Sequence, residues 1–134
     1  MCELCRMRDH RSLHAWQEAQ AVALGVIGLA RDNWKPYAAA LFSQLQRASL
    51  STQLNIAEGY AFGESPTYTR HLCIAYGSAV ETGELLEIGL KATVIPAGPG
   101  TQLLNRNRRS QRLLLGLLRA TKAKRERRNV SGKE

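Results

Sequence analysis

The chain has 134 residues, of which 44% are hydrophobic and 22% charged, and its formal net charge is +8. This length fits one domain with a core of its own. Its apolar runs fall well short of the roughly 20 residues that cross a bilayer, and the N-terminus lacks a signal-peptide layout, so we predict a cytoplasmic protein with no membrane partner. Three cysteines, an odd number, predict reduced thiols and no disulfide framework.

The positive charge is concentrated at the C-terminal end. Residues 1–104 carry eight Lys/Arg and nine Asp/Glu, a net charge of −1, whereas residues 105–134 carry eleven and two, a net charge of +9. Such an asymmetry indicates an anionic partner, most often nucleic acid.

Apolar residues at helical spacing predict two helices in the N-terminal half. The first covers residues 13–33, with Ser12 as its N-cap, and the second covers residues 37–60. Gly59 and Gly63 are expected to end the second helix.

Two further helices are predicted after residue 64. Ser65 followed by Pro66 is a strong start signal for the third helix. Residues 94–100 hold two prolines and two glycines and are expected to form a loop, so the fourth helix is placed at residues 101–124. No segment alternates long enough to predict a strand. The predicted fold is an all-α, antiparallel up-and-down four-helix bundle.

This bundle is expected to be a single domain that spans the chain, residues 1–134. Residues 1–11 show no helical period and are expected to be flexible. Residues 122–134 are expected to form a basic C-terminal tail.

The second predicted helix carries a polar stripe between two apolar flanks. The stripe consists of Gln44, Arg47, Ser51, Asn55 and Glu58. Because a surface helix has one apolar face, two flanks predict packing on two sides, with Leu50 and Leu54 facing a second subunit. The stripe residues either satisfy one another in a seam or contact a ligand.

Three patches of sequence resemble one protein family. They are Gln44, Arg47, Ala48, Ser51 and residues 55–60 (NIAEGY) in the second helix; Leu13, Trp16, Gln17 and Ala19 in the first; and Ala75, Gly77, Ser78 and Glu81 in the third. Together they resemble the bacterial four-helix bundle proteins encoded within intervening sequences of the large ribosomal RNA gene. That family is similar to the accessory variability proteins of diversity-generating retroelements. The resemblance implies a ring-shaped homo-oligomer, a pentamer of four-helix protomers.

The N-terminus holds the residue types of a metal site. Cys2, Cys5, His10 and His14 follow the spacing C-x2-C-x4-H-x3-H, which has enough ligands for tetrahedral zinc. The glycines and the aromatic residue of a zinc knuckle are absent, so a thiol-bearing tail without metal is the preferred interpretation. We therefore predict no cofactor.

The acidic residues of the third helix do not predict an enzyme. Glu81, Glu84 and Glu87 recur every three residues, but no partner base, nucleophile or phosphate-binding loop accompanies them. They are interpreted as a solvated acidic face or as the counterpart of Arg47. A di-iron site is excluded because no Glu-x-x-His motif occurs.

The basic tract is the candidate functional site. Its cations are Arg106, Arg108, Arg109, Arg112, Arg119, Lys122, Lys124, Arg125, Arg127 and Arg128. Arginine forks suit phosphate oxygens, and the tract has no Trp or Phe for base stacking or membrane insertion. We expect a non-enzymatic oligomeric protein that binds RNA or DNA through phosphates. The alternatives are an adaptor or accessory subunit for a reverse transcriptase or other RNA enzyme, and a solubilising tail.

Overall fold

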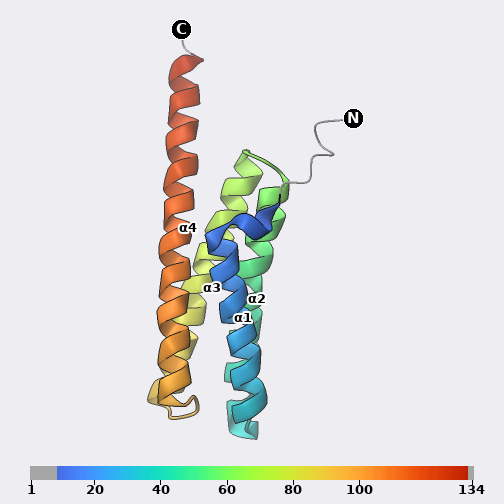
Figure 1. Cartoon of the computed structure of the whole chain (residues 1–134), viewed down its shortest axis with the longest axis vertical. Helices are drawn as coiled ribbons and strands as arrows, with labels where there is room; N and C mark the ends of the chain where they lie inside the picture. The colour runs from blue at the N-terminus through green and yellow to red at the C-terminus, as the bar shows by residue number, and fades with distance from the viewer. Residues whose placement is uncertain (1–8, 133–134) are drawn as a thin grey trace.

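The computed structural model describes residues 9–132, and their regular secondary structure is entirely helical. The α-helices are α1 (His14–Asn33), α2 (Ala39–Ala61), α3 (Pro66–Lys91) and α4 (Ala97–Ser131), with short 3₁₀ turns η2 (His10–Ser12) before α1 and η3 (Pro36–Ala38) before α2. Helices α1 and α3 each pack against both α2 and α4. The predicted all-α four-helix bundle is confirmed (Figure 1). None of the helices described is long and apolar enough to cross a membrane.

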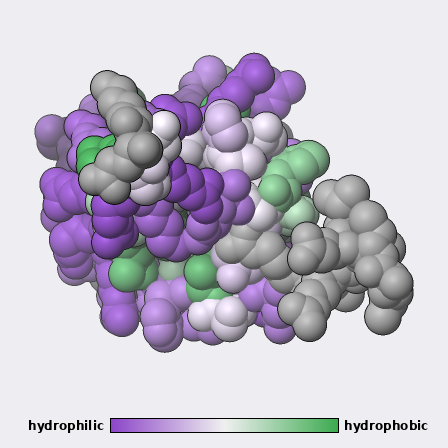
Figure 2. All heavy atoms as spheres, turned by 90° about the horizontal axis from the view of Figure 1, so that it is seen from above, coloured by the Kyte–Doolittle hydropathy of each residue, from purple (hydrophilic) through white to green (hydrophobic). Residues whose placement is uncertain are grey.

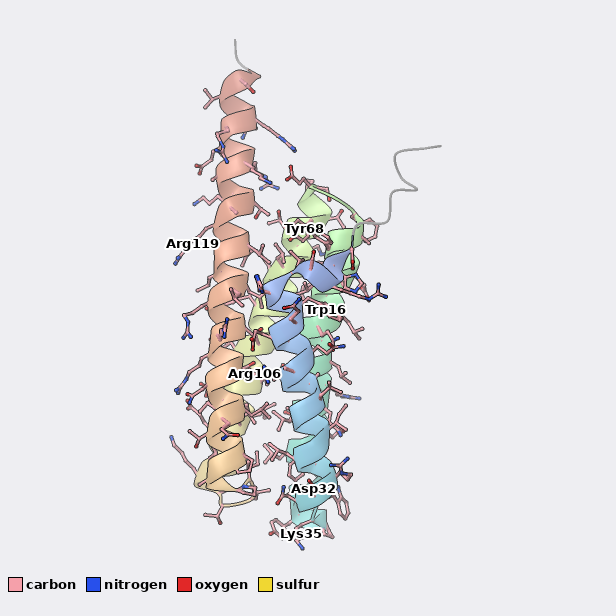
Figure 3. The ribbon with its side chains drawn as sticks, viewed as in Figure 1. Trp16, Asp32, Lys35, Tyr68, Arg106 and Arg119 are labelled. Carbon is pink, nitrogen blue, oxygen red and sulfur yellow. The ribbon has the colours of Figure 1, made fainter. Side chains whose placement is uncertain are left out.

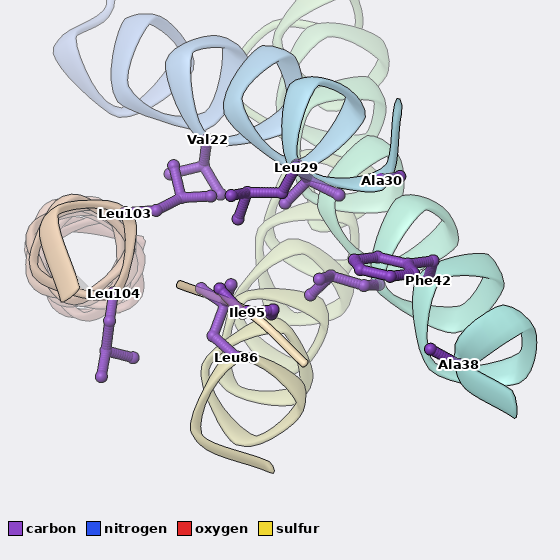
Figure 4. Packing of buried hydrophobic residues seen from close by; sticks show 11 residues of the cluster. Val22, Leu29, Ala30, Ala38, Phe42, Leu86, Ile95, Leu103 and Leu104 are labelled. Atoms are coloured by element: carbon purple, nitrogen blue, oxygen red, sulfur yellow. The ribbon is translucent and has the colours of Figure 1, made fainter. Parts of the chain in front are cut away.

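The core follows the bundle axis in two clusters. One lies toward the α1–α2 and α3–α4 connections, where side chains from all four helices meet (Figure 4). Its members include Val26, Phe42, Leu45, Leu86 and Leu103. The other lies toward the α2–α3 connection and includes Ala15, Ile56, Leu72, Ala75 and Leu114. Burying each large apolar side chain contributes about 1.5–3 kcal/mol, so these clusters are the main source of stability.

The predicted start of α3 is confirmed at the level of single atoms. Ser65 is the N-cap, and its Oγ accepts a hydrogen bond from the backbone N–H of Tyr68 at 3.2 Å. Pro66 is the first helical residue, where no intrahelical partner for its nitrogen is needed.

One predicted boundary in the N-terminal half is wrong. Leu13 and not Ser12 is the N-cap residue of α1, while Ser12 donates its hydroxyl to the backbone oxygen of Asp9 at 3.0 Å. Helix α2 ends at Ala61, one residue beyond the predicted end, so Gly59 lies in its last turn and does not stop it. The chain turns only at Gly63, whose φ of 70° is a conformation that glycine adopts at low cost.

Helix α4 is longer at both ends than the predicted residues 101–124. It begins at Ala97 because Pro99 lies in the first turn, where backbone N–H groups have no intrahelical partner. It continues to Ser131 because Arg, Lys, Ala and Glu are good helix formers. The predicted basic tail is therefore helical as far as residue 131.

Candidate nucleic-acid interface

The basic tract lies on α4, which is the longest helix of the bundle and projects past the others (Figure 1). Its apolar side holds it in place: Leu103, Leu104 and Leu114 are buried, and Leu117 and Leu118 pack half-buried against the second core cluster. From Lys122 to Ser131 every residue is exposed. The tract is therefore anchored by its first half and surrounded by solvent in its second.

All ten cations of the tract are exposed, but three of them near the middle of the bundle lie close to two carboxylates. Arg106 Nε contacts Glu18 Oε2 at 2.9 Å, and Arg109 Nη1 lies 3.8 Å from Glu18 Oε1. Arg106 lies between α4 and α1 (Figure 3). Arg108 Nη2 contacts Glu87 Oε1 of α3 at 3.1 Å. These residues thus join α4 to its two neighbouring helices.

A groove of about 870 Å³ separates α1 from α4 at this level. Arg106, Arg109 and Arg112 line its α4 side, and Glu18 and Asp32 line its α1 side. The side chain of Glu18 is only 13% exposed, so its carboxylate is held close to the two arginines it contacts. The groove therefore has mixed charge, with three arginines on one side and two carboxylates on the other.

Near the projecting end, one carboxylate meets two cations. Glu64 belongs to the connection between α2 and α3, and its two oxygens contact Lys124 Nζ and Arg128 Nη2, the latter at 2.9 Å. Lys124 and Arg128 are four residues apart, so they share one face of α4. This face looks toward the α2–α3 connection.

The remaining five cations of the tract, here called the free cations, make no ion pair or side-chain hydrogen bond within residues 9–132. They are Arg112, Arg119, Lys122, Arg125 and Arg127, and all are exposed. Arg119 points away from the bundle (Figure 3). Seen along the long axis from the end where α4 projects, the surface is mainly hydrophilic with small apolar areas (Figure 2).

The polar stripe of α2 divides into a seam and an exposed part. Ser51 Oγ lies 2.9 Å from Ser78 Oγ of α3, and Asn55 Oδ1 lies 2.9 Å from His71 Nδ1. Glu58 Oε2 is 4.0 Å from the same His71 nitrogen. These contacts fit the interpretation that the stripe residues satisfy polar groups between helices.

Gln44 and Arg47 of the stripe are exposed and have no polar side-chain partner in the part of the chain that the structure describes. One interpretation of the sequence paired Arg47 with the acidic residues of α3. Within the protomer this pairing does not form. Glu81 and Glu84 are exposed without an ion pair in this part of the chain, and Glu87 pairs with Arg108 instead.

The second apolar flank of α2 is open to solvent in the protomer. Leu50 is 39% exposed and Leu54 is 54% exposed. Both leucines are thus accessible for contact with another chain, as their predicted role requires.

The proposed zinc ligands are only partly described, since Cys2 and Cys5 lie outside residues 9–132. His10 is in the turn η2, with its ring 5.1 Å from that of Trp16, and His14 is exposed in the first turn of α1. Within residues 9–132, no three His, Cys, Asp or Glu side chains come together in a way that would hold a metal ion.

The carboxylates that pair with the tract were not found by sequence reasoning. Glu18, Glu64 and Glu87 lie 88, 60 and 21 residues from Arg106, Lys124 and Arg108, respectively. No spacing rule connects such residues. A strongly basic helix in a bundle with nine acidic residues elsewhere was the only available signal.

A comparison with curated proteins finds no match. A family model described as "23S rRNA-intervening sequence protein" matches residues 11–116, which include α1, α2, α3 and the first half of α4. The match ends before Arg119, so the projecting part of the tract lies outside it. Because the match covers most of the bundle and contains the NIAEGY run, the chain belongs to the 23S rRNA-intervening sequence protein family.

Proposed function

We propose that this protein binds RNA or DNA without acting as an enzyme, through contacts between the α4 tract and backbone phosphates. The observation that carries the proposal is the set of five free cations on α4, four of which lie from Arg119 onward in its C-terminal part. Phosphate-led binding draws its affinity from Lys and Arg side chains and from the counterions that they release. The family description, which refers to 23S rRNA, is compatible with an RNA partner.

The composition of α4 supports phosphate contacts over base contacts or membrane contacts. Residues 105–131 contain no aromatic side chain, so base stacking has no platform. A membrane-bound amphipathic helix would need Trp, Phe or Leu opposite its charges, and the part from Lys122 to Ser131 has none of the three. Such an interface binds with little preference for sequence.

A salt titration tests the proposal. Binding of the full chain to labelled RNA and DNA oligonucleotides of two unrelated sequences is measured from about 50 to 500 mM salt. We expect a steep linear fall of log K with log salt and similar affinities for the two sequences. Absence of binding to either nucleic acid at about 50 mM salt contradicts the proposal and favours an adaptor that docks an acidic protein, such as a reverse transcriptase.

We also propose that the protein self-associates through the exposed flank of α2, with five protomers expected from the resemblance. Leu50 and Leu54, one turn apart, would be covered by a neighbouring chain. Several tracts on one assembly would strengthen weak phosphate contacts by avidity.

Leu54→Glu is expected to lower the oligomer mass while leaving the helical content intact, because a carboxylate buried at an apolar contact has no partner. Light scattering and circular dichroism measure the two quantities. Val130→Glu adds the same charge at a 67% exposed position on the projecting end and is expected to leave the mass unchanged. A monomeric wild type, or equal masses for wild type and Leu54→Glu, rejects this interface.

A further inference from the structure

A hollow lies between the start of α3 and the projecting part of α4. Its volume is about 190 Å³, and it is lined by residues of both elements, including Glu64 and Ser65 on one side and Lys124, Arg125 and Arg128 on the other. A water molecule takes about 30 Å³ in the liquid, so the hollow has room for a group the size of a phosphate. The α2–α3 connection forms one wall of the hollow. Figure 1 shows that α4, which forms the other wall, continues past this connection.

The carboxylate of Glu64 occupies the position of an anion between two cationic donors. Lys124 Nζ and Arg128 Nη2 each contact a different oxygen of this carboxylate. A nucleic-acid phosphate offers the same arrangement, two anionic acceptor oxygens on one centre, to which an ammonium and a guanidinium bind well. The donors around Glu64 are therefore arranged as a phosphate subsite would be.

We infer that Lys124 and Arg128 form a phosphate subsite of the α4 interface and that Glu64 competes with the phosphate for it. This inference rests on the proposed function. The Glu64 side chain is 40% exposed and those of its partners at least 50%, so the ion pairs are weak and exchange readily with an incoming anion. Glu64 thus weakens binding to every sequence alike and sets the salt concentration at which nucleic acid is released.

The test compares two glutamates of the full chain. Glu64→Gln removes the competing charge, and Glu126→Gln removes an equal charge from α4, where Glu126 has no ion-pair partner among residues 9–132. We expect Glu64→Gln to bind single-stranded RNA several-fold more tightly than wild type at about 0.1 M salt, with a salt slope steeper by about 1.4 for two added contacts. Glu126→Gln is expected to leave the slope unchanged.

A chain without the two cations shows whether Glu64→Gln changes the affinity through Lys124 and Arg128. In a chain that carries Lys124→Gln and Arg128→Gln, the Glu64→Gln exchange is expected to alter neither the affinity nor the slope beyond the effect of Glu126→Gln. Melting temperatures of all variants should stay close to wild type because exposed ion pairs contribute little stability.

The outcomes separate this inference from the proposed function. If wild type binds RNA and the two single variants have the same slope, the competition by Glu64 is wrong while phosphate-led binding stands. If neither wild type nor Glu64→Gln binds RNA or DNA at about 50 mM salt, both are wrong.

Discussion

Exchange of Arg119, Lys122 and Arg127 for glutamine is expected to weaken RNA binding about a hundredfold near 0.1 M salt. Each phosphate contact contributes about 0.7 to the slope of log K against log salt for single strands. Loss of three contacts therefore makes the slope shallower by about 2. The fold should be unaffected, because all three side chains are exposed and none has a polar partner in the described bundle.

The matched control removes the same charge from the rest of the surface. Lys35, Arg70 and Lys91 are exposed and lie outside α4. Their exchange for glutamine also lowers the net charge by three and is expected to leave the salt slope unchanged. Fluorescence anisotropy at five or more salt concentrations, with circular dichroism to verify folding, measures both variants.

Equal loss of affinity in the two triple variants would contradict a localised interface. Binding would then follow the net charge of the whole protein, and the projecting helix would be one contributor among several. A shallower slope in the α4 variant alone supports the tract as the site of phosphate contact.

The presence of the four helices could be predicted from this sequence, because the apolar spacing and the start signals agree with how the helices pack. The apolar positions of α1 recur at helical spacing, and Ser65 with Pro66 starts α3 as expected. The ends of α4 were less accessible to sequence reasoning. Pro99 looks like a helix breaker, but whether a proline breaks a helix depends on its position, and in the first turn it removes no hydrogen bond.

The connection before α4 also depends on contacts that sequence cannot show. Ile95 is buried against Gly89 and Gly100, where an added Cβ would approach its side chain to 2.4 Å and 2.6 Å. These glycines therefore serve close packing. Composition alone predicts a loop over residues 94–100, because a tertiary contact of this kind leaves no periodic signal.

The candidate site, too, could be predicted only in part from the sequence. Its cations were visible in the charge distribution, since eleven of the nineteen Lys/Arg fall in residues 105–134. Which of them are free was not, because this depends on where Glu18, Glu64 and Glu87 arrive in the folded bundle. Sequence thus located the tract, and the fold distinguished its paired from its unpaired members.

Gly59 of the NIAEGY run is the position where a small substitution is expected to cost most. It lies in the last turn of α2, where the helix does not yet stop, and it is buried against α3. An added Cβ would stand 2.6 Å from His71 Cβ and 3.2 Å from Tyr68 Cδ2. Because the first of these atoms is fixed to the α3 backbone, the two helices would have to separate.

Gly59→Ala is therefore expected to destabilise the bundle by about 1–2 kcal/mol. Overpacking costs about 1–3 kcal/mol, which outweighs the 0.5–1 kcal/mol or so that alanine gains over glycine within a helix. Gly77→Ala is the matched control: Gly77 is exposed in α3, and an added Cβ would meet no atom within 4 Å apart from its own stretch of helix. It should stabilise the protein by about 0.5–1 kcal/mol.

Urea unfolding of the two variants measures the difference, whose sign is the decisive quantity. Opposite signs mean that the glycine of the NIAEGY run is required for the close approach of α2 to α3, next to the contact between Asn55 and His71. Stabilisation by both substitutions would show that helix propensity dominates at both positions and that α2 and α3 are not so tightly packed at Gly59.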